Sequence, residues 1–274
     1  MIITTLVENT CHLPQLSSEH GLSLYAEALE KKFLFDLGQG DLFLRNAKEL
    51  KVAIQDVDFV IISHGHYDHG GGLRTLFHEL PHVPVYIRET AFGNYYTNGP
   101  DGDEQYIGLD KTLLESSQVI LTPRRLELHP GIELFSGVRG SDFNPSGNRQ
   151  LLMDTEGALT PDTFDHEQNL IVTEGKKTFL FAGCAHRGIA NIMEQFYRLK
   201  RHYPTYVIGG FHLYSRSKGV SEEPERITAL GEYLKDKPTI YYTCHCTGLP
   251  AYQQLKEQLG EQIHYLSTGS HITI

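Results

Sequence analysis

The sequence has no apolar run long enough to cross a membrane. No stretch approaches the roughly 18 consecutive apolar residues that a spanning helix needs. The first residues, Met1 to Glu8, also lack the basic segment and the long apolar segment of a signal peptide. We therefore expect a cytoplasmic protein with no membrane partner.

Positive charge is in short supply. The chain has 24 lysines and arginines against 34 aspartates and glutamates, which gives a formal net charge of −10. This balance disfavours the broad binding of phosphate backbones that basic proteins show, so no nucleic-acid partner is expected. A local basic pocket for a small anionic molecule remains compatible with it. The composition does not indicate an oligomeric state.

Cysteines are also few, namely Cys11, Cys184, Cys244 and Cys246. In a reducing compartment we expect free thiols or metal ligands rather than disulfides. Cys11 and one of the last pair are expected to be buried and unreactive, because free cysteine packs like a small hydrophobic residue. The Cys-x-Cys spacing of the last pair is not that of a zinc ribbon.

The most informative stretch is residues 59–72, where a short apolar run leads into a cluster of histidines. Phe59 to Ile62 are consecutive apolar residues, which is typical of a buried parallel strand. Four potential donors to a divalent metal follow at once: His64, His66, Asp68 and His69. The alternative is a solvated loop that happens to be rich in histidine. Chance would not place every donor directly after a buried strand, so the pattern predicts a metal site.

The remaining pattern alternates strands and helices along a chain long enough for a substantial core. It predicts strands at 2–7, 22–29, 32–37, 59–62, 83–88, 169–173, 178–182, 205–208 and 239–243, and helices at 42–51, 73–80, 189–203, 225–234 and 250–259.

A strand, a glycine-rich turn with donors and a helix recur in two halves of the chain, roughly 1–90 and 165–274. Between them we expect a loop-rich insertion, 90–150, with short strands and a substrate-facing loop. The pattern predicts a single α/β domain over 1–274, built as a two-sheet αββα sandwich with its donors at one edge.

The HxHxDH motif of residues 64–69 resembles the signature of the metallo-β-lactamase superfamily. Three later runs resemble motifs of a narrower branch, the 7,8-dihydropterin-6-methyl-4-(β-D-ribofuranosyl)aminobenzene-5′-phosphate synthase-like proteins. They are Gly183-Cys-Ala-His-Arg-Gly-Ile-Ala-Asn191, Gly209-Gly-Phe-His-Leu213 and His245-Cys-Thr-Gly248. One departure is Ala185, where that branch more often has serine. The resemblance implies the four-layer αββα sandwich of metallo-β-lactamase type.

The resemblance also implies two divalent metal ions. A cysteine donor favours zinc, with manganese or iron as alternatives. The implied ligands are His64, His66 and His166 for the first ion, and Asp68, His69 and His245 for the second, with Cys184 near or bridging the second.

Some of these assignments compete with other interpretations. His212 competes with His245 as the last ligand, and it could instead be a core histidine. His166 could be an exposed hairpin residue, and Cys184 a buried structural thiol. Asp36 resembles an aspartate that braces the metal loop through hydrogen bonds, although it could equally cap the helix that follows it.

The function that this resemblance implies is a metal-dependent hydrolase acting on a small, anionic and phosphorylated substrate. Asp68 would also hold or accept a proton, His186 or His212 would donate a proton or contact phosphate, and Arg187 would bind the anion. One alternative is a pterin-type transferase that displaces diphosphate from a dihydropterin methyl carbon. Another is a sensor that binds metal without catalysis.

Overall fold

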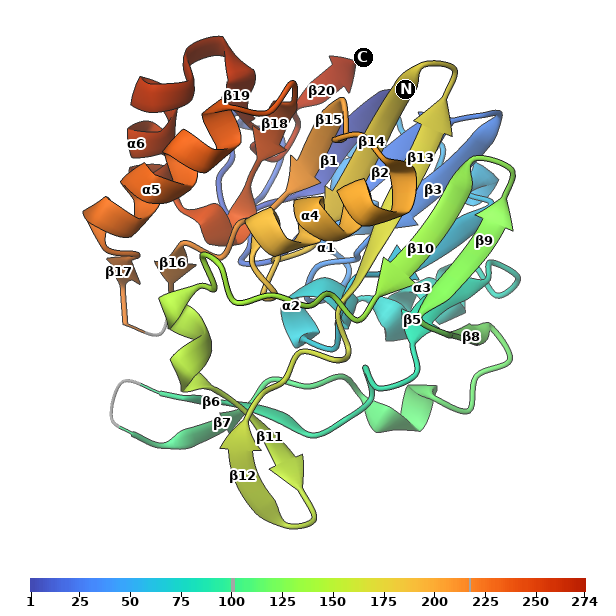
Figure 1. The fold of residues 1–274 in the computed structure, drawn as a ribbon. Coiled ribbons are helices and arrows are strands. Elements are labelled where there is room, and N and C mark those ends of the chain that lie inside the picture. The colour runs from blue at the N-terminus through green and yellow to red at the C-terminus, as the bar shows by residue number, and fades with distance from the viewer. Residues whose placement is uncertain (100–101, 217) are drawn as a thin grey trace.

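The computed structural model describes residues 1–99, 102–216 and 218–274, and in it the chain folds into four layers (Figure 1). Two sheets lie face to face, each with seven strands among the described residues. In spatial order the first comprises β20 (His271–Thr273), β1 (Ile2–Val7), β2 (Ser23–Ala28), β3 (Lys31–Phe35), β4 (Phe59–Ile62), β5 (Val85–Arg88) and β8 (Val119–Thr122). The second comprises β19 (Ile263–Tyr265), β18 (Ile240–Thr243), β15 (Tyr206–Gly209), β14 (Lys177–Ala182), β13 (Gln168–Glu174), β10 (Ile132–Ser136) and β9 (Arg125–His129).

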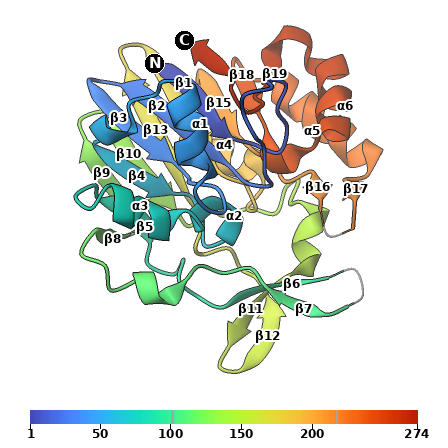
Figure 2. The same cartoon turned by 180° about the vertical axis from the view of Figure 1, so that it is seen from behind.

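Helices cover the outer faces of both sheets. Figure 1 shows α4 in front of the second sheet, and Figure 2 shows α1 and α3 over the first. The α-helices are α1 (Leu42–Glu49), α2 (Tyr67–Gly70), α3 (Leu73–Glu79), α4 (Ile189–Lys200), α5 (Pro224–Lys235) and α6 (Leu249–Leu259). Short 3₁₀ turns are η1 (Ile54–Asp56), η2 (Lys111–Leu113), η3 (Ser146–Gln150), η4 (His245–Thr247) and η5 (Gly260–Gln262). The predicted α/β αββα sandwich is therefore confirmed.

The apolar run before the histidine cluster is buried on both of its faces. Phe59 and Ile61 pack between the two sheets, whereas Val60 and Ile62 pack under the helices of the first sheet. Successive side chains of a strand point to opposite faces, so a strand covered on both sides must be apolar at every position. This explains why all four residues of β4 are apolar.

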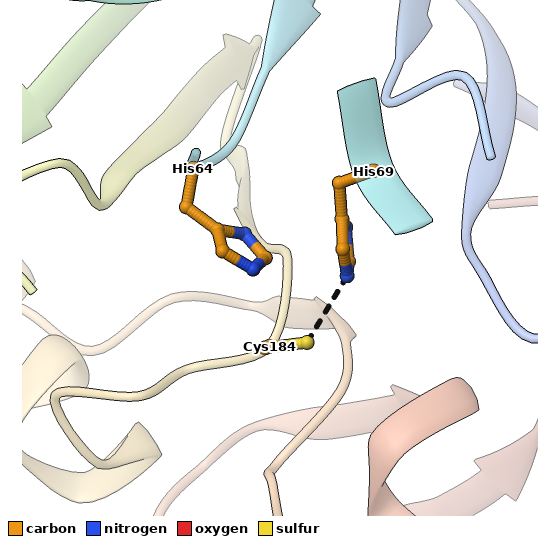
Figure 3. Close-up of side chains that lie close together, drawn as sticks. All are labelled: His64, His69 and Cys184. Atoms are coloured by element: carbon orange, nitrogen blue, oxygen red, sulfur yellow. Dashed lines mark hydrogen bonds between the residues drawn. The ribbon is translucent and has the colours of Figure 1, made fainter. Parts of the chain in front are cut away.

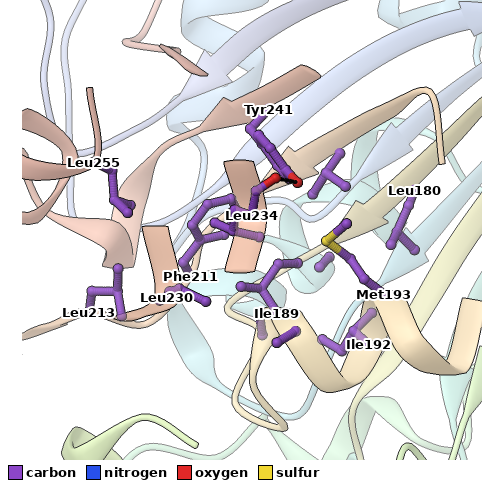
Figure 4. Close-up of a cluster of buried hydrophobic side chains, with 14 of the residues drawn as sticks. Leu180, Ile189, Ile192, Met193, Phe211, Leu213, Leu230, Leu234, Tyr241 and Leu255 are labelled. Carbon is purple, nitrogen blue, oxygen red and sulfur yellow. Dashed lines mark hydrogen bonds between the residues drawn. The ribbon is translucent and has the colours of Figure 1, made fainter. Parts of the chain in front are cut away.

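The second sheet repeats this arrangement. Phe179 and Phe181 of β14 face the first sheet, while Leu180 packs under α4 and α5. Figure 4 shows that outer cluster, in which the Tyr241 hydroxyl donates to the Leu234 carbonyl at 2.8 Å. Each fully buried side chain of this size contributes about 1.5–3 kcal/mol, so the two sheets form a firm platform for the loops at their edge.

Parallel strands carry the candidate donors to one edge. In the first sheet β3, β4, β5 and β8 run parallel, and in the second β14, β15, β18 and β19 do. Loops after parallel strands share the carboxyl edge of a sheet, where α/β proteins place their sites. The turns after β4, β14, β15 and β18 bear His64, Cys184, His212 and His245 respectively.

The segment expected as a loop-rich insertion contributes strands to three sheets. Its β8 and the β9–β10 hairpin extend the two main sheets. Its β6 (Tyr95–Asn98) and β7 (Glu104–Tyr106) pair instead with β11 (Leu151–Thr155) and β12 (Ala158–Pro161) in a four-stranded sheet that projects from the body (Figure 1). A small ribbon of β16 (Tyr214–Ser215) and β17 (Val220–Ser221) lies beyond β15.

The two ends of the chain meet. Strand β20 pairs antiparallel with β1, and the Met1 ammonium donates to the Ile274 carbonyl at 2.7 Å. The first and last strands thus form one side of the first sheet, and hydrogen bonds from Glu8 and Asn9 hold the loop after β1 beside the loop after β18. Among the described residues, no helix has the length and apolar character required to span a membrane.

Candidate metal centre

Asp36 lies at the base of the site. It follows β3 directly in a left-handed backbone conformation, with φ 62°, and it is fully buried. Its carboxylate accepts the Ser63 backbone N–H, the Ser63 hydroxyl and His69 Nδ1, each at 2.7 Å. Asp36 therefore braces the loop after β4, which is one of the two roles that the sequence left open. A non-glycine residue held at positive φ costs free energy, which structures tolerate mostly at functional sites.

Three imidazoles converge in the first donor group, which consists of His64, His66 and His186. His64 Nε2 lies 3.1 Å from His66 Nδ1 and 3.3 Å from His186 Nε2. All three side chains are buried. Atoms bound to one zinc ion at about 2.0–2.1 Å with tetrahedral angles would lie about 3.3 Å apart, so the spacing suits a common metal.

Hydrogen bonds on the far side of the rings determine which nitrogens are free. Ser63 gives its hydroxyl hydrogen to Asp36, so its oxygen accepts from His64 Nδ1 at 2.8 Å. The Asn148 side-chain oxygen lies 3.2 Å from His186 Nδ1, and the Asn148 amide donates to the His186 carbonyl. The rings of His64 and His186 thus carry their hydrogens on Nδ1, and their Nε2 lone pairs point into the group, where His66 presents Nδ1. Metal-binding histidines are held in this way by outer hydrogen bonds.

His166 does not join this group, because hydrogen bonds within the protein engage both of its ring nitrogens. Nδ1 accepts the Gly65 backbone N–H at 3.0 Å, and Nε2 lies 3.0 Å from a carboxylate oxygen of Asp162. Gly65 stands between His64 and His66, so His166 supports the loop that carries them. The structure thus brings His186, the predicted proton donor or phosphate contact, into the first donor group, and it places the predicted ligand His166 behind the loop.

The second donor group consists of Asp68, His69 and His245. His69 Nε2 lies 3.1 Å from His245 Nε2, and the two lie 3.8 and 3.3 Å from Asp68 Oδ2. Asn9 orients His245, since its side-chain oxygen lies 2.8 Å from Nδ1. Asp36 orients His69 in the same manner. His245, rather than His212, is the residue brought to this group.

Cys184 lies between the two groups. Its sulfur is 3.1 Å from His69 Nε2, and the donor atoms of His64, His69 and Cys184 all lie within 4.8 Å of one another. Figure 3 shows the sulfur facing His69, with the His64 ring opposite. The thiol is buried at the turn after β14, and a second thiol, Cys246, forms a further donor group with Cys184 and His245.

His212 and Arg187 have different surroundings. The His212 ring is 4.2 Å from that of His186, its backbone is left-handed at φ 51°, and its buried Nδ1 has no hydrogen-bond partner among the described residues. Arg187 instead donates through its guanidinium to the Val138 and Thr163 carbonyls. These bonds fix the loop before α4.

A pocket of about 500 Å³ opens onto both donor groups. Residues of β6 and β7, from the segment expected to face substrate, line this pocket. Sequence reasoning missed two further lining residues, His20 and Arg216. His20 stands in a Glu-His-Gly turn just before a strand, and this pattern could have identified it. No sequence pattern marks Arg216. The lining comprises His20, His66, Tyr67, Asp68, Thr97, Gln105, Tyr106, Ile107, Gly147, Gln150, Leu151, Cys184, His186, His212, Tyr214, Ser215, Arg216, His245 and Cys246.

The electrostatics of the site suit a transition metal. Burial and neighbouring imidazoles hold the pKa of His64 and His186 well below the ordinary value and lower that of His66 to about 3. Burial raises the pKa of Asp68, but His69 and hydrogen bonds from His20 and His245 outweigh it and keep the carboxylate ionised. Neutral imidazoles, a carboxylate and a thiol are donors for zinc, manganese or iron rather than calcium. The residues present therefore fit the divalent metals that the sequence implied.

Comparisons with known proteins identify the family of the chain. Two proteins of Methanocaldococcus jannaschii are similar over most of their length. They are MJ0448, 29% identical over 262 residues (93% of this chain and 94% of that protein), and 7,8-dihydropterin-6-methyl-4-(beta-D-ribofuranosyl)-aminobenzene-5'-phosphate synthase, 28% identical over 273 residues (93% and 90%). The crystal structure of Tm1679, described as a metal-dependent hydrolase of the beta-lactamase superfamily, matches with a TM-score of 0.83 and 28% identity, covering 100% of this chain and 99% of that one. The family model described as Metallo-beta-lactamase superfamily matches residues 22–218. The resemblance seen in the sequence is confirmed, and the chain belongs to the metallo-β-lactamase superfamily.

Proposed function

We propose that the protein is a metal-dependent hydrolase that uses two divalent ions, preferably zinc, on a small anionic substrate. One observation carries the proposal: two groups of buried imidazole nitrogens converge at a pocket of about 500 Å³. Its named relatives, a synthase and a metal-dependent hydrolase, are enzymes, which favours catalysis over sensing.

The proposed ligand sets follow from the hydrogen bonds. His64, His66 and His186 would hold the first ion, and Asp68, His69 and His245 the second, with Cys184 between them. Burial raises the pKa of the Cys184 thiol, so a bound ion is what would keep this sulfur as a thiolate.

Divalent ions in such a site lower the pKa of water and polarise a phosphoryl or acyl oxygen. The residues of the chain supply the remaining functions. The contacts of Asp68 with His20, His69 and His245 all use Oδ2, so we assign Oδ1 the task of orienting the attacking water. His212, which lines the pocket beside His186, is our candidate for proton donor to the leaving group.

The substrate anion is assigned to Arg216 in place of Arg187. Arg216 is exposed on the pocket wall, and its charge contributes to lowering the pKa of His20, so it lies near the second donor group. A guanidinium can bind a phosphate or carboxylate through two parallel hydrogen bonds. Tyr67, Tyr106 and Tyr214 give the same pocket aromatic walls.

A second candidate is the pterin-type transferase, and the specific observation in its favour is the 28% identity to the synthase over 93% of this chain. The same metal ligands would serve, because a departing diphosphate needs the same stabilisation of negative charge. Product class, rather than metal content, separates the two activities.

The deciding assay gives the zinc-loaded protein a panel of phosphomonoesters and phosphodiesters and, separately, a dihydropterin diphosphate with an aromatic amine acceptor. Hydrolysis of phosphate esters that disappears in His64→Ala together with zinc would support the hydrolase. A coupled pterin product without ester hydrolysis would replace it with the transferase. Two bound ions without turnover on either panel would favour the sensor.

A further inference from the structure

His20 lies at the second donor group although it belongs to none of the motifs around that group. Its ring lies on the pocket wall, and its side chain is 20% exposed. Nε2 is 3.1 Å from Asp68 Oδ2, and the ring centroid is 4.8 Å from that of His245. The donor atoms of His20, Asp68 and His245 all lie within 4.8 Å of one another.

The loop that carries His20 is fixed to the metal loop by its backbone. The Leu22 N–H donates to the Asp68 carbonyl at 3.1 Å, and the Gln39 side chain donates to the His20 carbonyl. Gly21 packs so closely that a Cβ there would lie 2.6 Å from the Asp68 carbonyl oxygen. A side chain at position 21 would push the loop away, so the close approach of His20 to Asp68 is built into the fold.

The same loop orients another proposed ligand. The Asn9 side-chain oxygen accepts the Gly21 N–H at 3.2 Å and lies 2.8 Å from His245 Nδ1. Glu8 accepts the His245 backbone N–H at 2.6 Å. The segment between β1 and β2 thus holds His245 from outside the donor group while presenting His20 from the pocket side.

We propose that His20 is a further ligand of the second metal ion, an inference that rests on the proposed two-metal centre. The Nε2 atoms of His20, His245 and His69 lie 3.1, 3.3 and 3.8 Å from Asp68 Oδ2. These separations are close to the roughly 3.3 Å between ligand atoms on one tetrahedral zinc ion.

This ligand would make the two metal positions unequal. The second ion would have a carboxylate and three imidazoles, with the Cys184 sulfur adjacent, and so a filled set of ligands. The first ion would have three imidazoles and an open position. Catalytic zinc sites keep one position open, whereas closed sites hold their metal for structure. Water would therefore bind at the open position on the side of His64 and His186, with the second ion held more firmly.

The competing role for His20 is a hydrogen bond that merely orients Asp68. The two roles respond differently to His20→Gln, because a glutamine amide can still donate to Asp68 but lacks an imidazole lone pair. His12→Ala is a matched control, since His12 is an exposed histidine of the same loop. Free imidazole supplied to His20→Ala can replace the missing ring without changing the chain.

The experiment titrates metal-free wild type and each variant with Co²⁺ and follows visible absorption and bound equivalents. Wild type and His12→Ala should bind two equivalents. His20→Ala and His20→Gln should keep one and bind the other at least about tenfold more weakly, with altered absorption. Imidazole should restore the wild-type spectrum of His20→Ala.

Each other outcome has a defined meaning. If His20→Gln binds both equivalents with wild-type affinity and spectrum, His20 only orients Asp68 and the inference is wrong. If wild type binds two ions and imidazole leaves His20→Ala unchanged, the inference fails while the two-metal centre stands. If wild type binds fewer than two ions, the proposed two-metal function fails first and the inference with it.

Discussion

Histidines dominate both donor groups, but the groups that surround the rings differ in charge. His64 and His186 have neutral oxygens behind them, and burial together with neighbouring imidazoles lowers the pKa values of His64, His66 and His186. His69, in contrast, lies between Asp36 and Asp68. Burial lowers its pKa, but these carboxylates outweigh burial and raise it to about 9. The first group is therefore ready to bind a cation, whereas the second must exchange a proton for it.

The origin of the residues differs as well. The first group uses the turns after β4 and β14, one in each half of the chain. The second depends on the two ends, because His245 follows β18 and its support comes from Asn9, after β1. Pairing of β1 with β20 brings these ends together. The second group is thus the one that requires the whole chain to be folded.

The largest effect should come from removing His186 from the first donor group. We expect His186→Ala to bind one ion instead of two and to lose about 1,000-fold or more in kcat/KM, because a ligand is missing. His166→Ala should keep both ions and lose stability, since Gly65 and Asp162 lose their partner. Metal analysis with thermal melting tests the pair, and the reverse result would restore His166 as the ligand.

Removing the charge of Asp36 should have the second-largest effect, and it should act on the second donor group. Asp36→Asn leaves three buried donors without their charged acceptor, so we expect a loss of about 2–4 kcal/mol in unfolding free energy. Affinity for the second ion should fall about 10–100-fold. Denaturant unfolding and competitive zinc titration measure the two quantities. An unchanged second affinity would show that Asp36 does not orient His69.

The pH dependence of metal binding distinguishes the groups directly. Below about pH 9 metal-free His69 carries a proton that the ion must displace, and a thiolate at Cys184 requires the loss of a second one, so affinity for the second ion should rise at least about tenfold per pH unit between pH 6 and 8. His66, with a pKa of about 3, carries no such proton there, so affinity for the first ion should be nearly flat. Titration against a competing chelator of known pH behaviour gives both slopes. If affinity for the two ions had the same pH dependence, the proposed electrostatic difference between the two donor groups would be wrong.

The smallest effect concerns the substrate side of the second group. Arg216→Ala should raise KM for anionic substrates about tenfold with kcat nearly unchanged, because it removes ground-state binding. Arg187→Ala should leave KM unaltered and lower the melting temperature, since its guanidinium holds two backbone carbonyls. Steady-state kinetics on one charged and one neutral substrate would test this, and a KM effect confined to Arg187→Ala would reverse the assignment.

The sequence determined the platform and the local half of the site. Unbroken apolar strands followed by glycine turns specify a sheet buried on both faces, and the spacing of residues 64–69 places several donors on one loop wherever that loop lies. Only the tertiary structure decided which distant residues complete the site. His166 and His186 look alike in sequence, but Gly65 and Asp162 engage both nitrogens of the first, while Asn148 leaves one nitrogen of the second free. Likewise His20 reaches Asp68, and Arg187 is withdrawn from the pocket, through contacts between segments far apart in the chain, which local pattern cannot encode.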